Sequence, residues 1–129
     1  MRFLLLAAAL AITAPTLAVA ADQSAKAEVL MANFSFTPET LHLHAGQSVT
    51  IHFVNNGSGG HDFTAEKFFS AAAMDAANRT KVGGTKGRVS LGKGASVDVT
   101  LTPRAGEYPA HCSHFLHSTM GMTGKIQVD

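Results

Sequence analysis

The chain has 129 residues, of which 46% are hydrophobic, and its ten Lys and Arg against nine Asp and Glu give a formal net charge of +1. This near balance excludes the strongly cationic proteins that bind nucleic acid or anionic membranes through charge. The chain has one cysteine, which excludes a disulfide within it, so this thiol needs another role or protection.

The first twenty residues, MRFLLLAAALAITAPTLAVA, have the pattern of a secretory signal peptide. Arg2 precedes an apolar run, and small residues come just before the expected cleavage point. The run is shorter than the about 20 residues that a membrane-spanning helix needs. We expect residues 1–20 to be removed, although an uncleaved anchor is the alternative. Residues 21–129 would then be a single exported domain.

Short strands separated by turns follow this leader. Residues 27–36 (AEVLMANFSF) run up to Pro38, which ends a regular ladder because proline has no N–H. In residues 40–56 (TLHLHAGQSVTIHFVNN) apolar and polar residues alternate, with His42 and His44 on the outward face. This period of two predicts strands with one buried side.

The middle of the chain has a different composition. Residues 65–78 (AEKFFSAAAMDAAN) are rich in alanine and follow Thr64, which we expect to cap one short helix. Residues 79–94 (RTKVGGTKGRVSLGKG) are glycine-rich and cationic, and are predicted to form a connection. We predict an all-β antiparallel sandwich with one short helical insertion. Its closing strands would fall at residues 95–103, 106–112 and 123–129.

Residues 111–122 (HCSHFLHSTMGM) gather three of the seven histidines, two of the five methionines and the cysteine. Two histidines, one cysteine and a weak axial methionine suit copper. Zinc favours a fourth strong ligand, and the chain has no second cysteine. Cys112, His117 and Met122 are evenly spaced in this loop, and His61, after the flexible NNGSGG segment, is the candidate for the missing histidine.

From about Ala27 to the end, the sequence resembles the cupredoxins, the blue copper family of plastocyanin, azurin and pseudoazurin. The resemblance rests on FSFTPETLHLHAGQSVTIHFVNN, NNGSGGHD, EYPAHC and MTGKIQV. The spacing between Cys112 and His117 differs from that of plastocyanin and is similar to that of azurin. The resemblance implies a Greek-key fold and one type 1 copper ion. Its implied strong ligands are His61, Cys112 and His117, and its implied axial ligand is Met122.

The same loop is similar to the last copper motif of multicopper oxidases, HCH-x3-H-x3-GM. Ser113 stands where that motif has its second histidine. In the oxidases, the two histidines that flank the cysteine carry electrons to a trinuclear centre. With one of them missing we expect no such centre, and we expect that the protein is not an enzyme.

Several alternatives stay open from the sequence. His114 competes with His117 as a ligand, and Met120 competes with Met122. Phe115 and Leu116 belong either to the core or to an apolar rim where redox partners dock. Auxiliary copper contacts would come from His42, His44, His111, His114 or Met120. We also expect Asp62 and Ser113 to hydrogen-bond across the site and hold its two loops together.

These patterns predict a periplasmic, monomeric protein that shuttles single electrons between redox partner proteins. It would bind no nucleic acid and, after signal cleavage, no membrane. The alternative is a protein that sequesters or delivers copper, and the surplus of His and Met residues around the site motivates it.

Overall fold

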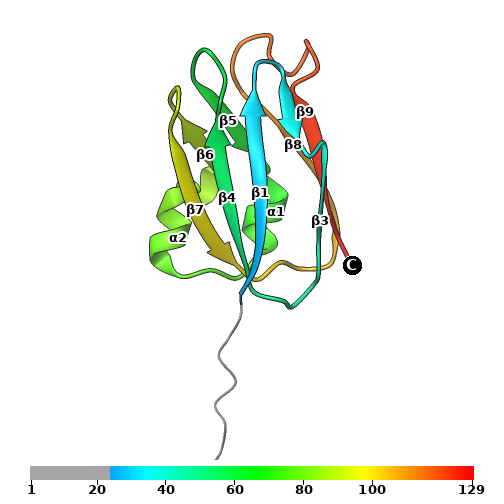
Figure 1. Ribbon diagram of the computed structural model, residues 1–129. Helices are drawn as coiled ribbons and strands as arrows, with labels where there is room; N and C mark the ends of the chain where they lie inside the picture. Colours follow the sequence, from blue (N-terminus) through cyan, green and yellow to red (C-terminus); the bar gives the residue numbers. More distant parts are fainter. Residues whose placement is uncertain (1–23) are drawn as a thin grey trace, which may run out of the picture.

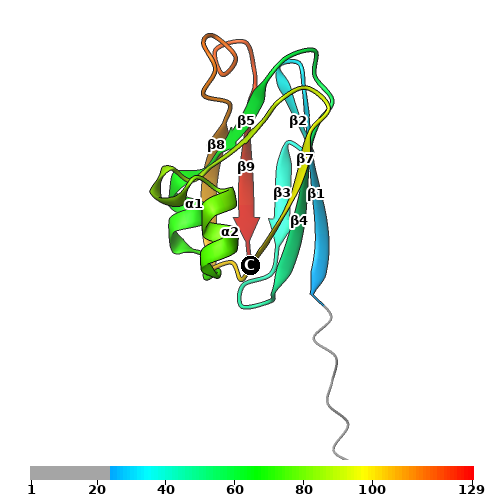
Figure 2. The same cartoon turned by 90° about the vertical axis from the view of Figure 1, so that its left-hand side faces the viewer.

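The computed structural model describes residues 24–129, so the expected signal peptide, residues 1–20, lies outside the described residues. Nine strands form two facing sheets, and two short helices lie beside them near the end where β1 begins (Figures 1 and 2). Within the described residues, no helix has the length and apolar character that crossing a membrane requires.

The first sheet has four strands in the order β2–β1–β4–β7. Its central strands β1 and β4 run parallel, with Val29 opposite Phe53, and the two outer pairs are antiparallel. The strands are β1 (Ala25–Ala32), β2 (Ser35–Thr37), β4 (Val49–Asn55) and β7 (Ser96–Leu101).

The second sheet has five strands in the order β3–β9–β8–β5–β6. Here β3 and β9 run parallel, and the other neighbours are antiparallel. The strands β5 and β8 meet through Thr64 and His111, which are register partners. The strands are β3 (Thr40–Leu43), β5 (His61–Thr64), β6 (Arg88–Leu91), β8 (Gly106–His111) and β9 (Thr123–Val128).

The core lies between the inner faces of the two sheets. The alternation expected in residues 40–56 is confirmed, because Ile51 and Phe53 are fully buried while the side chains of His42 and His44 are exposed. The Phe53 ring lies 5.3 Å from the Phe63 ring of the opposite sheet. Aromatic contacts of this kind fix the separation of the sheets and, with it, the relative positions of the loops at their ends.

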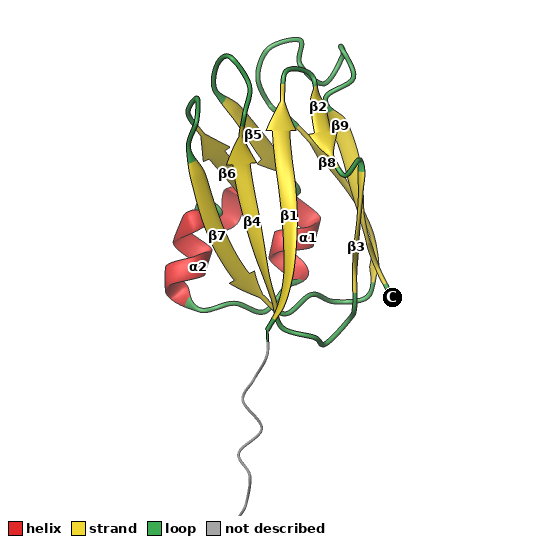
Figure 3. Ribbon diagram, in the orientation of Figure 1, coloured by secondary structure: helices red, strands yellow, loops and turns green. Residues whose placement is uncertain are grey.

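The single helix predicted over residues 65–78 is wrong, because two short helices stand in its place (Figure 3). Ala72 adopts an extended conformation, and Ala73 then pairs through its backbone with Thr102 at 3.0 and 2.8 Å. A second helix begins after Asp75, whose side chain accepts from the N–H of Asn78. The helices are α1 (Glu66–Ala71) and α2 (Ala76–Lys81).

The prediction of a simple connection over residues 79–94 is also wrong. This segment contains the end of α2, a 3-10 helix η1 (Gly84–Lys86) and the strand β6, in which Val89 is buried. Gly87 has a φ of 57°, and a Cβ on it would lie 2.6 Å from the Cα of Glu66. Glycine is therefore required where the chain turns against α1. The predicted fold class, an all-β Greek-key sandwich, is confirmed. It was expected to be antiparallel throughout, but the pairs β1–β4 and β3–β9 run parallel.

Candidate metal centre

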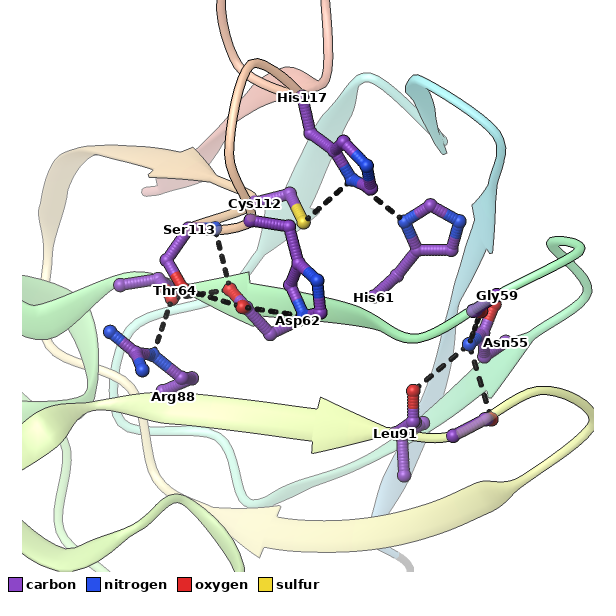
Figure 4. A network of polar contacts seen from close by, with 12 residues as sticks. Asn55, Gly59, His61, Asp62, Thr64, Arg88, Leu91, Cys112, Ser113 and His117 are labelled. Atoms are coloured by element: carbon purple, nitrogen blue, oxygen red, sulfur yellow. Dashed lines mark hydrogen bonds and ion pairs between the residues drawn. The ribbon is translucent and has the colours of Figure 1, made fainter.

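Three predicted ligands converge at one end of the sandwich (Figure 4). His61 begins β5, Cys112 follows β8, and His117 lies in the loop between β8 and β9. The Nδ1 atoms of the two histidines lie 3.2 Å apart, and the Cys112 Sγ lies 3.5 Å from the His117 Nδ1. All three donor atoms lie within 4.8 Å of one another. One small ion can therefore contact all three.

The register between β5 and β8 brings two of these segments together. Thr64 is the partner of His111, and continuing this antiparallel register places Asp62 opposite Ser113. The backbone N–H of Ser113 indeed donates to Asp62 at 2.9 Å. The residues adjacent to these two, His61 and Cys112, are carried into the same neighbourhood.

Backbone hydrogen bonds then fold the ligand loop over the site. The N–H of Cys112 donates to the carbonyl of Met122 at 3.1 Å, and the N–H of Met122 donates to the carbonyl of His117 at 2.9 Å. A turn closes inside the loop, where the His117 N–H donates to the His114 carbonyl at 3.1 Å. These bonds fix three of the predicted ligands relative to one another.

Burial sets the protonation of the donor atoms. Burial raises the pKa of the Cys112 thiol, and the backbone N–H groups of Asp62 and His114 act in the opposite direction. The pKa of His61 is lowered, first by burial and then by the charges of His117 and His114. His61 therefore stays neutral with a lone pair to share, while Cys112 must give up its proton when a metal binds.

Asp62 links the two ligand-bearing segments, as expected from the sequence. It accepts from the Ser113 hydroxyl at 2.6 Å and from the Thr64 hydroxyl at 2.6 Å. The predicted capping of the helix by Thr64 is therefore wrong, because its hydroxyl donates to Asp62 and α1 has no side-chain cap. Burial alone would raise the pKa of Asp62, but these hydrogen bonds and the one from the Ser113 N–H hold its pKa below the ordinary value.

The loop before His61 is held from inside by the fully buried Asn55. Its side-chain amide donates to the carbonyls of Gly59 and Leu91, both at 2.9 Å (Figure 4). Its side-chain oxygen accepts from the N–H of Gly57 at 2.9 Å. This asparagine holds the loop against the end of β6. The loop that leads into His61 is therefore fixed by hydrogen bonds, although its sequence is glycine-rich.

The Nε2 edge of the His61 ring packs against Asn33 and Gly57, two residues that the sequence analysis did not identify. The Asn33 Oδ1 lies 3.2 Å from the His61 Nε2 and also accepts from the Ser58 N–H at 2.9 Å. A Cβ on Gly57 would lie 2.4 Å from the same Nε2. A hydrogen bond from Nε2–H to Asn33 leaves the Nδ1 lone pair facing the cysteine and His117.

The rival ligands occupy different environments. Met122 is fully buried, whereas the side chain of Met120 is 59% exposed. The His114 ring stacks on the His117 ring at 5.4 Å, and its Nε2 lies 3.6 Å from the Asp62 carboxylate. Asp62, Cys112 and His114 thus form a second group of donor atoms within 4.8 Å of one another. Both groups use the same sulfur.

The remaining histidines lie outside these groups. His42, His44 and His111 are exposed. His52 lies on the outward face of β4, and its Nδ1 contacts the Asp98 carboxylate of β7 at 2.5 Å. None of these four belongs to the donor groups found among residues 24–129.

Phe115 and Leu116, which precede His117 in the loop, and Phe34, which contacts its ring, form what we call the apolar rim. Phe115 is 88% exposed and Leu116 is 50% exposed, so neither belongs to the core. Phe34, in the turn between β1 and β2, adds an edge-to-face contact with the His117 ring at 5.2 Å. Beside this rim, a surface depression of about 300 Å³ reaches both His61 and His117. The sequence named Phe115 and Leu116 but not Phe34, which belongs to a turn distant in the chain.

The donor chemistry fits a single type 1 copper ion. Two imidazoles and one buried cysteine sulfur are the soft and borderline donors that copper prefers, with a buried thioether nearby in the same loop. A closed zinc site would require a fourth strong donor. Among residues 24–129, no fourth His, Cys, Asp or Glu donor atom lies within 4.8 Å of all three donors of the first group.

Comparison with known proteins gives a family and a set of structural neighbours. Residues 2–128 match the family model described as a cupredoxin-like domain. Comparison with curated proteins gives no match.

The structural neighbours include three auracyanin structures. A dithionite-reduced auracyanin from the photosynthetic bacterium Roseiflexus castenholzii has a TM-score of 0.60 and 20% identity, covering 82% of this chain and 98% of its own. Auracyanin B has a TM-score of 0.56 and 25% identity, with 83% and 91% covered. Auracyanin A, described as a "blue" copper protein from the green thermophilic photosynthetic bacterium Chloroflexus aurantiacus, has a TM-score of 0.57 and 24% identity, with 82% and 99% covered.

Proposed function

Because the chain belongs to the cupredoxin-like family, we propose that it is an exported type 1 copper protein that carries single electrons between redox partner proteins. His61, Cys112 and His117 would be the strong ligands, and the buried Met122 the weak axial one. The observation that carries this proposal is the convergence of two Nδ1 atoms and one sulfur within 4.8 Å. The description of auracyanin A as a blue copper protein supports it.

The chain's own residues prepare the site for electron transfer. The one-electron chemistry would come from bound copper, which alternates between its +1 and +2 states. Asn33 and Gly57 hold the His61 ring from behind, and Asp62 fixes the loop that carries Cys112. A rigid set of ligands changes little between the two states, which keeps electron transfer fast. Burial of the sulfur excludes water and thiol reagents.

Electrons would enter and leave through the His117 edge. This ring lines the surface depression together with Phe34, and the exposed Phe115 and Leu116 precede it in the loop. An apolar rim suits brief contacts with a redox partner, since it associates without strong charge pairing. The protein would act as a carrier and not as an enzyme.

Export and organisation complete the proposal. Removal of residues 1–20 would release residues 21–129 into the periplasm as a single monomeric domain. The basis is the sequence of the leader, with its cation, apolar run and small residues.

Copper titration of the purified protein tests this function. We expect one equivalent of copper, intense thiolate-to-copper absorption in the visible, and reversible oxidation at a stable potential. Cys112→Ser should abolish the absorption, whereas His44→Ala, at an exposed histidine outside the donor groups, should retain it. Binding of several equivalents without thiolate absorption would contradict the proposal.

A copper-handling role is the second candidate. The second donor group, formed by Asp62, Cys112 and His114, offers an ion a neighbouring position on the same sulfur, which would suit transfer to an acceptor. Such a protein should hand its copper to a chelating acceptor faster than His114→Ala does. Equal transfer rates in the two proteins would favour the carrier.

A further inference from the structure

Asp62 is a carboxylate buried beside the metal centre, with 1% of its surface exposed. The direction of its hydrogen bonds is fixed by its neighbours. The Ser113 backbone N–H can only donate to it. The Thr64 hydroxyl accepts from the Arg88 Nε at 3.2 Å and donates its own proton to Asp62. Two donors therefore point at one oxygen of Asp62, and the Ser113 hydroxyl lies 2.6 Å from the other, an arrangement that favours the carboxylate anion (Figure 4).

This anion lies close to the atom that would bind copper. A carboxylate oxygen of Asp62 and the Cys112 Sγ lie within 4.8 Å of each other. Both residues are buried, so solvent screens little of their interaction. The Arg88 guanidinium donates its Nε–H to Thr64 and not to the carboxylate.

We propose that Asp62, besides clamping the ligand loop, acts as a positioning residue whose fixed negative charge favours oxidised over reduced copper. This inference rests on the copper role proposed above. Oxidised copper carries one more positive charge than reduced copper, so a nearby anion stabilises it more. An opposite charge within about 4–6 Å changes a proton affinity by about 10- to 1000-fold. We therefore expect at least about a tenfold effect on the ratio of Cu(II) to Cu(I) affinity.

The test compares Asp62→Asn with two matched variants by measuring Cu(I) and Cu(II) affinities separately. Asn keeps an acceptor oxygen and removes the charge. We expect Cu(II) affinity to fall about tenfold more than Cu(I) affinity, which corresponds to a potential about 59 mV higher for a one-electron couple. The difference should persist in high salt. Asp98→Asn removes an exposed charge on β7 and should leave the ratio unchanged.

Ser113→Ala separates the charge from the clamp, because it removes one hydrogen bond to Asp62 and keeps the carboxylate. It should leave the affinity ratio unchanged. In the copper-free proteins, hydrogen exchange of the Ser113 amide should stay slow in Asp62→Asn, since the new side-chain oxygen accepts the same bond. Fast exchange with an equal fall in both affinities would show a clamp alone and overturn the proposal.

A second variant covers the case in which Asp62→Asn does not fold. Arg88→Gln keeps a donor for Thr64 and removes a positive charge, so it should shift the ratio in the opposite direction, toward Cu(II). An unchanged ratio would overturn the proposal. A wild-type protein without thiolate-to-copper absorption would instead refute the proposed function itself, before any variant is compared.

Discussion

Gly57→Ala should displace His61 and weaken copper binding while leaving the fold intact. The new Cβ would lie 2.4 Å from the His61 Nε2 and 2.8 Å from the Asn33 Oδ1, whereas ordinary contacts begin near 3.4 Å. The ring must therefore retreat by about 1 Å to restore normal van der Waals separation. The φ of Gly57 is not in the left-handed region, so the backbone accepts alanine and the effect is steric.

The expected loss follows from the geometry of metal ligands. Ligand distances are held to about 0.2 Å, and a displacement of about 1 Å exceeds this several-fold. Changes to the supports of a ligand typically cost about 10- to 100-fold in metal affinity, and we expect a loss in that range. The hydrogen bond from the Gly57 N–H to Asn55 should survive, because it involves only the backbone of the substituted residue.

Competition between the protein and a copper chelator measures the affinity, and the visible spectrum reports the site. Gly59→Ala is the matched control, because a Cβ at that position meets nothing within 4 Å. Chemical denaturation of the copper-free proteins should give similar stabilities for all three. Wild-type affinity and an unchanged spectrum in Gly57→Ala would refute the reasoning that His61 is packed against this residue.

Two further predictions concern stability and use the copper-free protein. Phe53→Ala should lower the free energy of unfolding by about 3–5 kcal/mol, because this fully buried ring joins both sheets. Chemical denaturation measures this free energy, and the control Phe115→Ala, at an exposed ring, should change it little. Equal losses of stability in the two variants would contradict the assignment of Phe53 to the core. Hydrogen bonds from the Asn78 backbone N–H and then from its side-chain amide lower the pKa of Asp75 below its ordinary value of 3.8. Asp75 therefore stabilises the fold above pH 3.8, and this contribution is lost as the pH falls through the lower folded-state pKa. The difference in free energy of unfolding between wild type and Asp75→Ala should narrow as the pH falls below 3.8. A difference that stays constant with pH would contradict the role of Asp75 as the cap of α2.

The candidate metal ligands were easier to predict from the sequence than the residues that support them, for a physical reason. Copper requires particular donor atoms, so the candidate ligands His61, Cys112 and His117 could be named from residue type and from the resemblance to a family, and the structure brings them together. Their convergence depends on strands whose alternation was also visible in the sequence. The Asp62–Ser113 contact was predictable because each residue neighbours a ligand.

The errors lie where distant backbone segments meet. The break in the predicted helix comes from pairing between Ala73 and Thr102, and nothing local in the alanine-rich segment signals that pairing. Asn33 reaches His61 only because the β1–β2 turn folds back over the site. Polar turn residues are common, so such a role is invisible until the tertiary structure is known.

The positions of the start of β1 and the end of β9 determine where another molecule can be joined to this domain. β1 begins and β9 ends at one end of the sandwich, and the ligand loop between β8 and β9 lies at the opposite end (Figure 1). Val128 pairs with Gly106 at the start of β8, whereas Cys112 follows that strand, so the two ends are about 20 Å apart at 3.3 Å per residue. A tether, fusion partner or electrode linker joined just before β1 or just after β9 would leave the His117 face free to meet its reaction partner.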